Sequence, residues 1–140
     1  MNNFDFDEIK IGQKEKFEKT VTEEMMQSFG QICGDFNPLH TDRDYAISRG
    51  YKDKVVYGML SASFYSTLVG MYIPGKKCLF EEAKISFNKP VYIGDKLLIE
   101  GIVKEKHELF KRITIQAKIT QNNNTVSKAK LVVSGDWKNE

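Results

Sequence analysis

The chain has 140 residues, of which 41% are hydrophobic, enough to close one sizeable core but not a second. Its 21 basic and 19 acidic side chains are interspersed and give a formal net charge of +2, so composition indicates neither nucleic-acid nor membrane-surface binding. Cys33 and Cys78 are too few and too far apart for a disulfide framework, and the first residues lack the apolar stretch of a signal peptide. We therefore expect a single domain over residues 1–140 and a reduced, cytoplasmic setting.

The first third of the chain contains one strand, one helix and a loop-rich segment. Residues 14–21 read as a strand, after which Thr22 is placed to cap a helix whose first turn is acidic. We expect this helix to end at Cys33, because Gly34 follows it. Residues 35–51 then form a loop-rich stretch.

An uncharged segment follows over residues 55–75. It is too rich in Ser, Thr, Tyr and Gly for a membrane span, and it predicts instead a buried helix from about Tyr57. The helical spacing places one set of apolar residues on a single face: Leu60, Phe64, Leu68 and Met71. We expect this to be the central helix of the fold.

The second half of the chain predicts strands at residues 77–88, 96–106, 110–121 and 125–137, arranged as a meander. In the third strand, apolar side chains alternate with Thr114, Gln116, Lys118 and Thr120, a pattern typical of a sheet with one face on a core and one in water. The fold class that follows is α+β, with an antiparallel sheet wrapped around one long helix.

Residues 34–40, Gly-Asp-Phe-Asn-Pro-Leu-His, contain the most informative candidate chemistry. Asp35 and His40 lie on either side of a turn that Pro38 makes rigid, so the two side chains have a partly preset relative orientation and could share one water. An imidazole can accept a proton from water near neutral pH, while a carboxylate can orient that water or carry the returning proton. Taken alone, however, Asp-x-Asn-Pro is also a common turn and a loop histidine is commonly just a hydrogen-bonding side chain.

A second feature favours the catalytic interpretation. Tyr57-Gly58-Met59-Leu60 begins the central helix, whose first amides carry partial positive charge. The backbone amide of Gly58 could therefore stabilise negative charge developing on a thioester carbonyl, the kind of contact worth about 3 kcal/mol in an oxyanion site.

Three ordered elements, GDFNPLH, YGMLSASFYS and SFNKPVYIGD, together resemble the MaoC-like hydratases, which include the (R)-specific enoyl-CoA hydratases. The resemblance covers nearly the whole chain from about Lys10. It implies a hot-dog fold, homodimers, a catalytic pair at Asp35 and His40 and an oxyanion amide at Gly58.

The same resemblance, read with the residues around the motifs, suggests a set of substrate-binding positions: Asn37, Tyr57, Met59 and Ser66. Ser66 matches a serine that lines the active site of these hydratases, although a helix serine can equally bond back to its own backbone. Tyr57 departs from the family, which commonly has His before Gly-Met. If this position only shapes the pocket, activity should survive; if it holds the catalytic pair, rate or substrate should differ.

The implied reaction is syn addition of water to a trans-2-enoyl thioester, giving an (R)-3-hydroxyacyl thioester, or its reversal. The substrate would be carried by coenzyme A or by acyl carrier protein. The spacing of two histidines and two cysteines predicts no metal site, and the absence of a glycine-rich phosphate loop predicts no nucleotide cofactor.

Two other functions stay open at this stage. One is a hot-dog thioesterase, ranked second because such enzymes generally need an acidic residue near the central helix, and residues 57–73 contain neither Asp nor Glu. The other is a non-catalytic acyl-thioester-binding module, for which Tyr57 is the only support.

Overall fold

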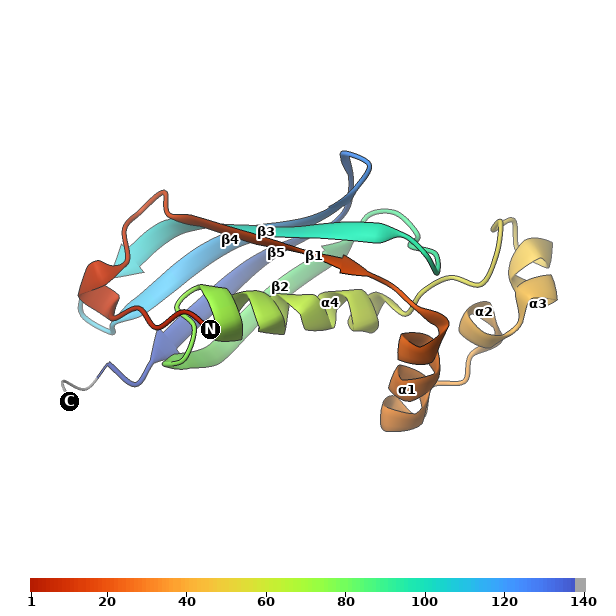
Figure 1. Ribbon diagram of the computed structural model, residues 1–140, viewed down its shortest axis with the longest axis horizontal. Helices are drawn as coiled ribbons and strands as arrows, with labels where there is room; N and C mark the ends of the chain where they lie inside the picture. The colour runs from red at the N-terminus through yellow and green to blue at the C-terminus, as the bar shows by residue number, and fades with distance from the viewer. Residues whose placement is uncertain (138–140) are drawn as a thin grey trace.

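The computed structural model describes residues 1–137 as a curved sheet with one helix against its inner side and three further helices, α1, α2 and α3, at one end (Figure 1). In chain order the helical elements are η1 (Phe6–Glu8), α1 (Glu23–Cys33), α2 (Pro38–Thr41), α3 (Arg43–Ser48), α4 (Gly58–Thr67) and the π-helical turn η2 (Leu68–Tyr72). The strands are β1 (Lys14–Thr20), β2 (Cys78–Phe87), β3 (Lys96–His107), β4 (Arg112–Gln121) and β5 (Asn124–Gly135).

The predicted strand and helix in the first third are confirmed, with their ends where the local chemistry places them. The Thr22 hydroxyl accepts a hydrogen bond from the Met25 amide at 3.2 Å, which caps α1. Gly34 ends the helix in the left-handed region, with φ of 74°, a conformation that glycine adopts without a steric penalty.

All five strands join one antiparallel sheet in the order β1-β3-β4-β5-β2. The predicted meander is right for β3, β4 and β5 but wrong for β2, which pairs with β5 at the far edge. The eight-residue connection 88–95 is too long for a tight hairpin, and it is held against the segment before α4 by a hydrogen bond from the Val56 amide to the Val91 carbonyl. β1 takes the place beside β3 instead.

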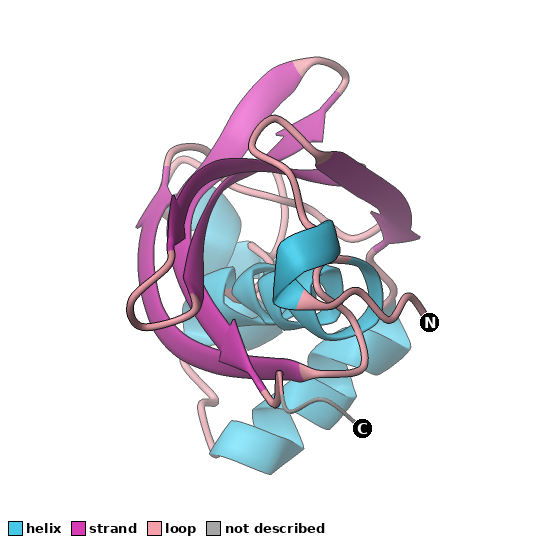
Figure 2. Cartoon of the chain, turned by 90° about the vertical axis from the view of Figure 1, so that its left-hand side faces the viewer, coloured by secondary structure: helices cyan, strands magenta, loops and turns pink. Residues whose placement is uncertain are grey.

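The sheet curls around α4, so the predicted hot-dog architecture is confirmed (Figure 2). The inner residues of β4 are buried as expected, but Thr114 and Thr120, predicted to face water, are only 5% and 8% exposed. β4 is the central strand, and neighbours on both sides cover these short side chains.

The apolar face predicted for the central helix is right for Leu60, Phe64 and Leu68, which are all buried. It is wrong for Met71, which is 44% exposed. The helix changes from α to π geometry at Leu68, and the wider i to i+5 turn rotates Met71 away from the face set by the earlier spacing.

The segment predicted as loop-rich contains two short helices, α2 and α3. Each begins at a side-chain cap: the Asn37 side chain accepts from the Leu39 amide at 3.0 Å, and that of Asp42 from the Tyr45 amide at 3.2 Å. The sequence of this segment indicated turns because Asn and Asp favour both turns and the N-caps of helices. Within residues 1–137, no helix is long and apolar enough to cross a membrane.

Candidate active site

The candidate site lies at the end of the molecule where the start of α4 meets α1 and α2 (Figure 1). Asp35 sits in the turn between α1 and α2. Its Oδ1 accepts a hydrogen bond from the Asn37 amide at 3.0 Å, while the residue stays exposed. Asn37 in turn caps α2, and Pro38 occupies the first helical position, where it loses no hydrogen bond. The carboxylate is therefore held by its own turn and still open to solvent.

His40 lies on α2 and is half-buried. Its Nδ1 is 2.7 Å from the carbonyl oxygen of Val55. A carbonyl can only accept, so Nδ1 carries the hydrogen and, in the neutral ring, Nε2 is left with a lone pair. Within residues 1–137, Asp35 and His40 form no ion pair or hydrogen bond with each other. The arrangement supplies a proton acceptor and a separate carboxylate.

Tyr57 contacts both members of the predicted pair. Its ring lies against the His40 ring with centroids 4.2 Å apart and an interplanar angle of 30°. Its hydroxyl donates a 2.6 Å hydrogen bond to the backbone carbonyl of Asp35. Burial raises the pKa of Tyr57, as do the neighbouring Asp35 and Cys33, so the phenol remains a protonated donor.

A cleft of about 320 Å³ opens beside these groups, between α1 and α2. His40 and Tyr57 line it together with apolar groups from Met26 and Phe36. At its edge the Lys54 Nζ is 2.9 Å from the Glu23 carboxylate. Polar side chains from Gln27, Gln31 and Thr41 complete the lining, so the cleft offers a ligand both apolar and hydrogen-bonding contacts around one imidazole.

Gly58 is the first residue of α4, and its amide has no acceptor within residues 1–137. A Cβ at this position would lie 3.1 Å from ring carbons of Phe87, so glycine permits the close approach of β2. Met59 follows with 61% of its surface exposed. The helix start thus presents a free amide next to two exposed apolar side chains, since Phe87 is 52% exposed.

Most of the predicted site residues gather at this end of the molecule, and Ser66 does not. It is exposed on α4 eight residues after Gly58, or about 12 Å along the helix at about 1.5 Å per residue. Sequence reasoning missed the Val55 carbonyl, Gly30 and Phe87. Phe87 belongs to the SFNKPVYIGD element, but that element does not reveal its contact with Gly58. No local pattern marks the other two, because each acts through a contact with a residue distant in the sequence.

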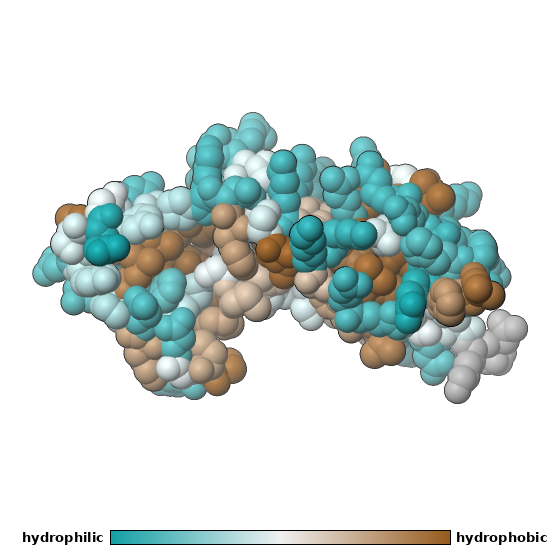
Figure 3. Space-filling model, turned by 180° about the vertical axis from the view of Figure 1, so that it is seen from behind, coloured by the Kyte–Doolittle hydropathy of each residue, from teal (hydrophilic) through white to brown (hydrophobic). Residues whose placement is uncertain are grey.

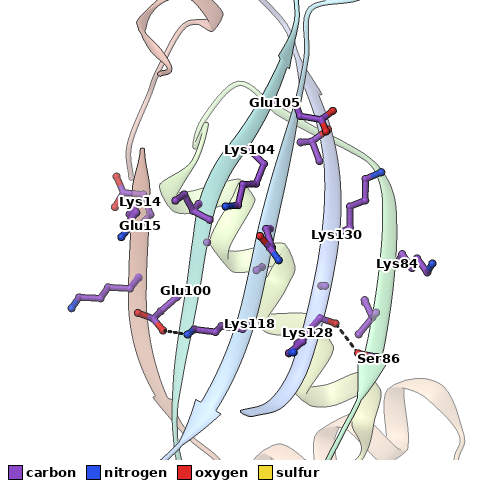
Figure 4. A pocket seen from close by; sticks show the side chains of 18 residues that line it. Lys14, Glu15, Lys84, Ser86, Glu100, Lys104, Glu105, Lys118, Lys128 and Lys130 are labelled. Atoms are coloured by element: carbon purple, nitrogen blue, oxygen red, sulfur yellow. Dashed lines mark hydrogen bonds and ion pairs between the residues drawn. The ribbon is translucent and has the colours of Figure 1, made fainter. Parts of the chain in front are cut away.

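A second, wider hollow of about 1200 Å³ lies on the outer face of the sheet (Figure 4). Its lining includes seven lysines and three glutamates, and α4 lies behind the strands in this view. Glu100 and Lys118 form an ion pair across it at 4.0 Å. The hollow shares no residue with the cleft at His40. Among residues 1–137, no three His, Cys, Asp or Glu side chains are grouped so as to hold a metal ion.

Known proteins match this chain along most of its length. The (R)-specific enoyl-CoA hydratase of Rhodospirillum rubrum is 35% identical over 105 residues, covering 72% of this chain and 73% of that protein. The mitochondrial 3-hydroxyacyl-[acyl-carrier-protein] dehydratase of Arabidopsis thaliana is 29% identical over 90 residues, covering 64% and 53%.

The fold is likewise shared with solved structures. The unliganded R-hydratase of Pseudomonas aeruginosa superimposes with a TM-score of 0.90 at 26% identity, covering 97% of this chain and 88% of that one. The family described as "MaoC like domain" matches residues 6–125. This chain therefore belongs to the MaoC-like family of hot-dog proteins.

Proposed function

We propose that this protein is an (R)-specific enoyl-thioester hydratase, which in the reverse direction is a 3-hydroxyacyl-thioester dehydratase. The observation that carries the proposal is the fixed tautomer of His40, which leaves Nε2 as a proton acceptor beside the cleft. Relatives named as a hydratase and as a dehydratase support the hydration and the dehydration direction, and both reactions are those of a hydro-lyase.

In the hydration direction, His40 Nε2 accepts a proton from water as the water oxygen bonds to the third carbon of the enoyl chain. The electrons of the double bond move toward the thioester carbonyl, whose oxygen gains negative charge. A proton returned by the His40 and Asp35 pair to the same face of the second carbon completes syn addition. Every atom of the water is then in the product, so no cofactor is required.

Asp35 orients the attacking water in this scheme. Its Oδ1 is engaged by the Asn37 amide, and its exposed carboxylate keeps further acceptor sites for the water. The free amide of Gly58 donates to the carbonyl oxygen as the negative charge develops. We assign substrate contacts to Asn37, whose side-chain nitrogen Nδ2 is not used in capping α2, and to Met59, which is exposed directly after Gly58.

The substrate is a thioester of coenzyme A or of acyl carrier protein. Relatives named for each carrier support both choices. Assays with short trans-2-enoyl chains on each carrier decide between them, because the reaction at the double bond is the same.

The test is the loss of absorbance of the conjugated enoyl thioester, with thiol release followed in the same samples. We expect double-bond loss without thiol release, and a fall in kcat of about 10²- to 10⁴-fold in Asp35→Asn and in His40→Gln. His107→Gln is the matched control, because His107 ends β3 and lies 3.1 Å from Glu105, outside the cleft. Thiol release would favour a thioesterase, and binding without turnover on either carrier would favour a binding module.

We further propose that the chain forms a single domain and works as a homodimer in the cytoplasm. A single cluster of buried side chains, extending from Phe6 to Val133, supports one domain. Beyond Met59, Ser63 and Ser66 form an exposed stripe on α4. The surface is hollowed beside the lobe that contains α1, and apolar side chains are visible around the hollow (Figure 3). A second copy would cover this stripe.

Sedimentation equilibrium tests the dimer. Phe87→Glu, which places a charge on exposed edge strand β2 beside the α4 start, should shift the protein toward monomer. Leu109→Glu is the control, because Leu109 is 86% exposed in the β3–β4 turn. The cytoplasmic proposal is supported by Cys33 and Cys78, both of which are free.

A further inference from the structure

We propose that Tyr57 is a positioning residue that fixes the position of Asp35 relative to His40. Gly30 provides the space that the Tyr57 hydroxyl needs. The inference rests on the proposed function, and it gives a role to the residue at which this chain departs from its family. It also replaces the substrate-binding role predicted for Tyr57.

The two contacts of Tyr57 reach the pair by different means. Its ring packs on one face of the His40 imidazole, with centroids 4.2 Å apart, while the Val55 carbonyl holds the edge of that imidazole at Nδ1. Together they restrict both the tilt and the rotation of the ring. Through its hydroxyl, Tyr57 holds the backbone of Asp35 at 2.6 Å, so one rigid side chain spans both residues.

The O–H donor of Tyr57 is used within the protein. The residue is only 3% exposed, and its single O–H points to the Asp35 carbonyl. Phe29 packs on the ring from α1, with centroids 5.1 Å apart. A side chain fixed in this way supports the reacting groups and has no donor left for a substrate.

The absence of a side chain at Gly30 leaves room for the Tyr57 hydroxyl. A Cβ on Gly30 would lie 2.8 Å from the Tyr57 hydroxyl oxygen, closer than real Cβ contacts allow. Its other neighbours, the Asp35 carbonyl and a Phe36 ring carbon, would each be at 3.6 Å, an ordinary contact. The hydroxyl alone therefore requires glycine at position 30, and a phenylalanine at position 57 would remove that requirement.

Steady-state kinetics of Tyr57→Phe and Tyr57→Leu separate the hydroxyl from the ring. Because misplacement of reacting groups lowers the rate of the chemical step, we expect kcat to fall about tenfold in Tyr57→Phe and about a hundredfold in Tyr57→Leu, with KM nearly unchanged. Tyr65→Phe is the matched control, since it removes another buried tyrosine hydroxyl of the same helix region, bonded to Ser127 at 2.8 Å, and should keep kcat. A rise in KM with normal kcat would overturn the proposal and restore a substrate-binding role.

The matched pair is tested by a double-mutant cycle. Gly30→Ala should lower kcat in the wild-type protein by displacing the hydroxyl from Asp35, and it should cause no further loss in Tyr57→Phe. Equal effects of Gly30→Ala in both backgrounds would contradict the proposed match.

A readout independent of substrate comes from the imidazole nitrogens. The chain has only two histidines, so nitrogen-15 NMR of the side chains gives two ring systems, with His107 as internal reference. At a pH where both rings are neutral, His40 should be a single Nδ1–H tautomer in wild type and Tyr57→Phe, and a mixture in Tyr57→Leu. An unchanged His40 spectrum in Tyr57→Leu would refute the positioning role. If wild type turns over no enoyl thioester, the proposed function fails, whereas this spectrum still decides whether Tyr57 holds His40.

Discussion

Gly101 allows the central helix to lie close against the sheet, and replacing it should destabilise the fold in a calculable way. It is buried on β3, opposite Ala117 of β4. A Cβ on Gly101 would lie 2.8 Å from a methyl carbon of Leu68 and 3.0 Å from one of Ile115. Both neighbours are 0% exposed, so neither can swing into solvent to make room.

Two opposing effects set the size of the change in Gly101→Ala. Overpacking a filled core costs about 1–3 kcal/mol. Replacing a glycine in a strand interior by alanine also stabilises the folded state by about 0.5–1 kcal/mol, because the unfolded chain has less conformational entropy to lose. Taking the middle of each range, we expect the free energy of unfolding to fall by about 1 kcal/mol, which for a chain of this size lowers Tm by about 3 °C.

Thermal unfolding followed by circular dichroism measures this shift. Gly70→Ala is the matched control, because Gly70 lies in η2 with nothing within 4 Å of an added Cβ. The better helical propensity of alanine should leave the control equal to wild type or about 0.5–1 kcal/mol more stable. A Gly101→Ala protein that melts at or above the wild-type Tm would show that the helix and sheet are not in the close contact described here.

Two further predictions concern buried groups. Tyr65→Phe should lower the free energy of unfolding by about 1 kcal/mol, measured by urea denaturation, because the hydrogen bond to Ser127 is lost; an unchanged midpoint would mean that this bond adds nothing. Burial raises the pKa of the Cys78 thiol to about 11, so at about pH 8 roughly one Cys78 thiol in a thousand is ionised. Because iodoacetamide reacts with the thiolate, it should modify exposed Cys33 and spare Cys78 in the folded protein. Mass spectrometry of the peptides checks this, and equal labelling at both cysteines before unfolding would contradict it.

The sequence predicted those parts of the structure that depend on neighbouring residues. The cap at Thr22 and the left-handed Gly34 mark the ends of α1, because both act within one helical turn. Apolar residues at every second position marked β4, since the side chains of a strand alternate between its faces. The Asp35 to His40 segment stood out because a proline and two turn-forming side chains are adjacent in the chain.

The tertiary structure decided what depends on contacts between distant residues. β2 joins β5 rather than β3, and the connection between β2 and β3 is hydrogen-bonded to the segment before α4; no local pattern records either contact. Met71 is exposed because the helix changes to π geometry where it meets the sheet.

The same distinction applies to Tyr57. The sequence showed that this residue departs from the family but not what it touches, because its hydroxyl bonds to a carbonyl 22 residues earlier in the chain. Local backbone preferences act over a few residues and can be read along the chain. Pairing partners, sheet edges and side-chain contacts at the site are chosen by packing among segments that only the folded chain brings together.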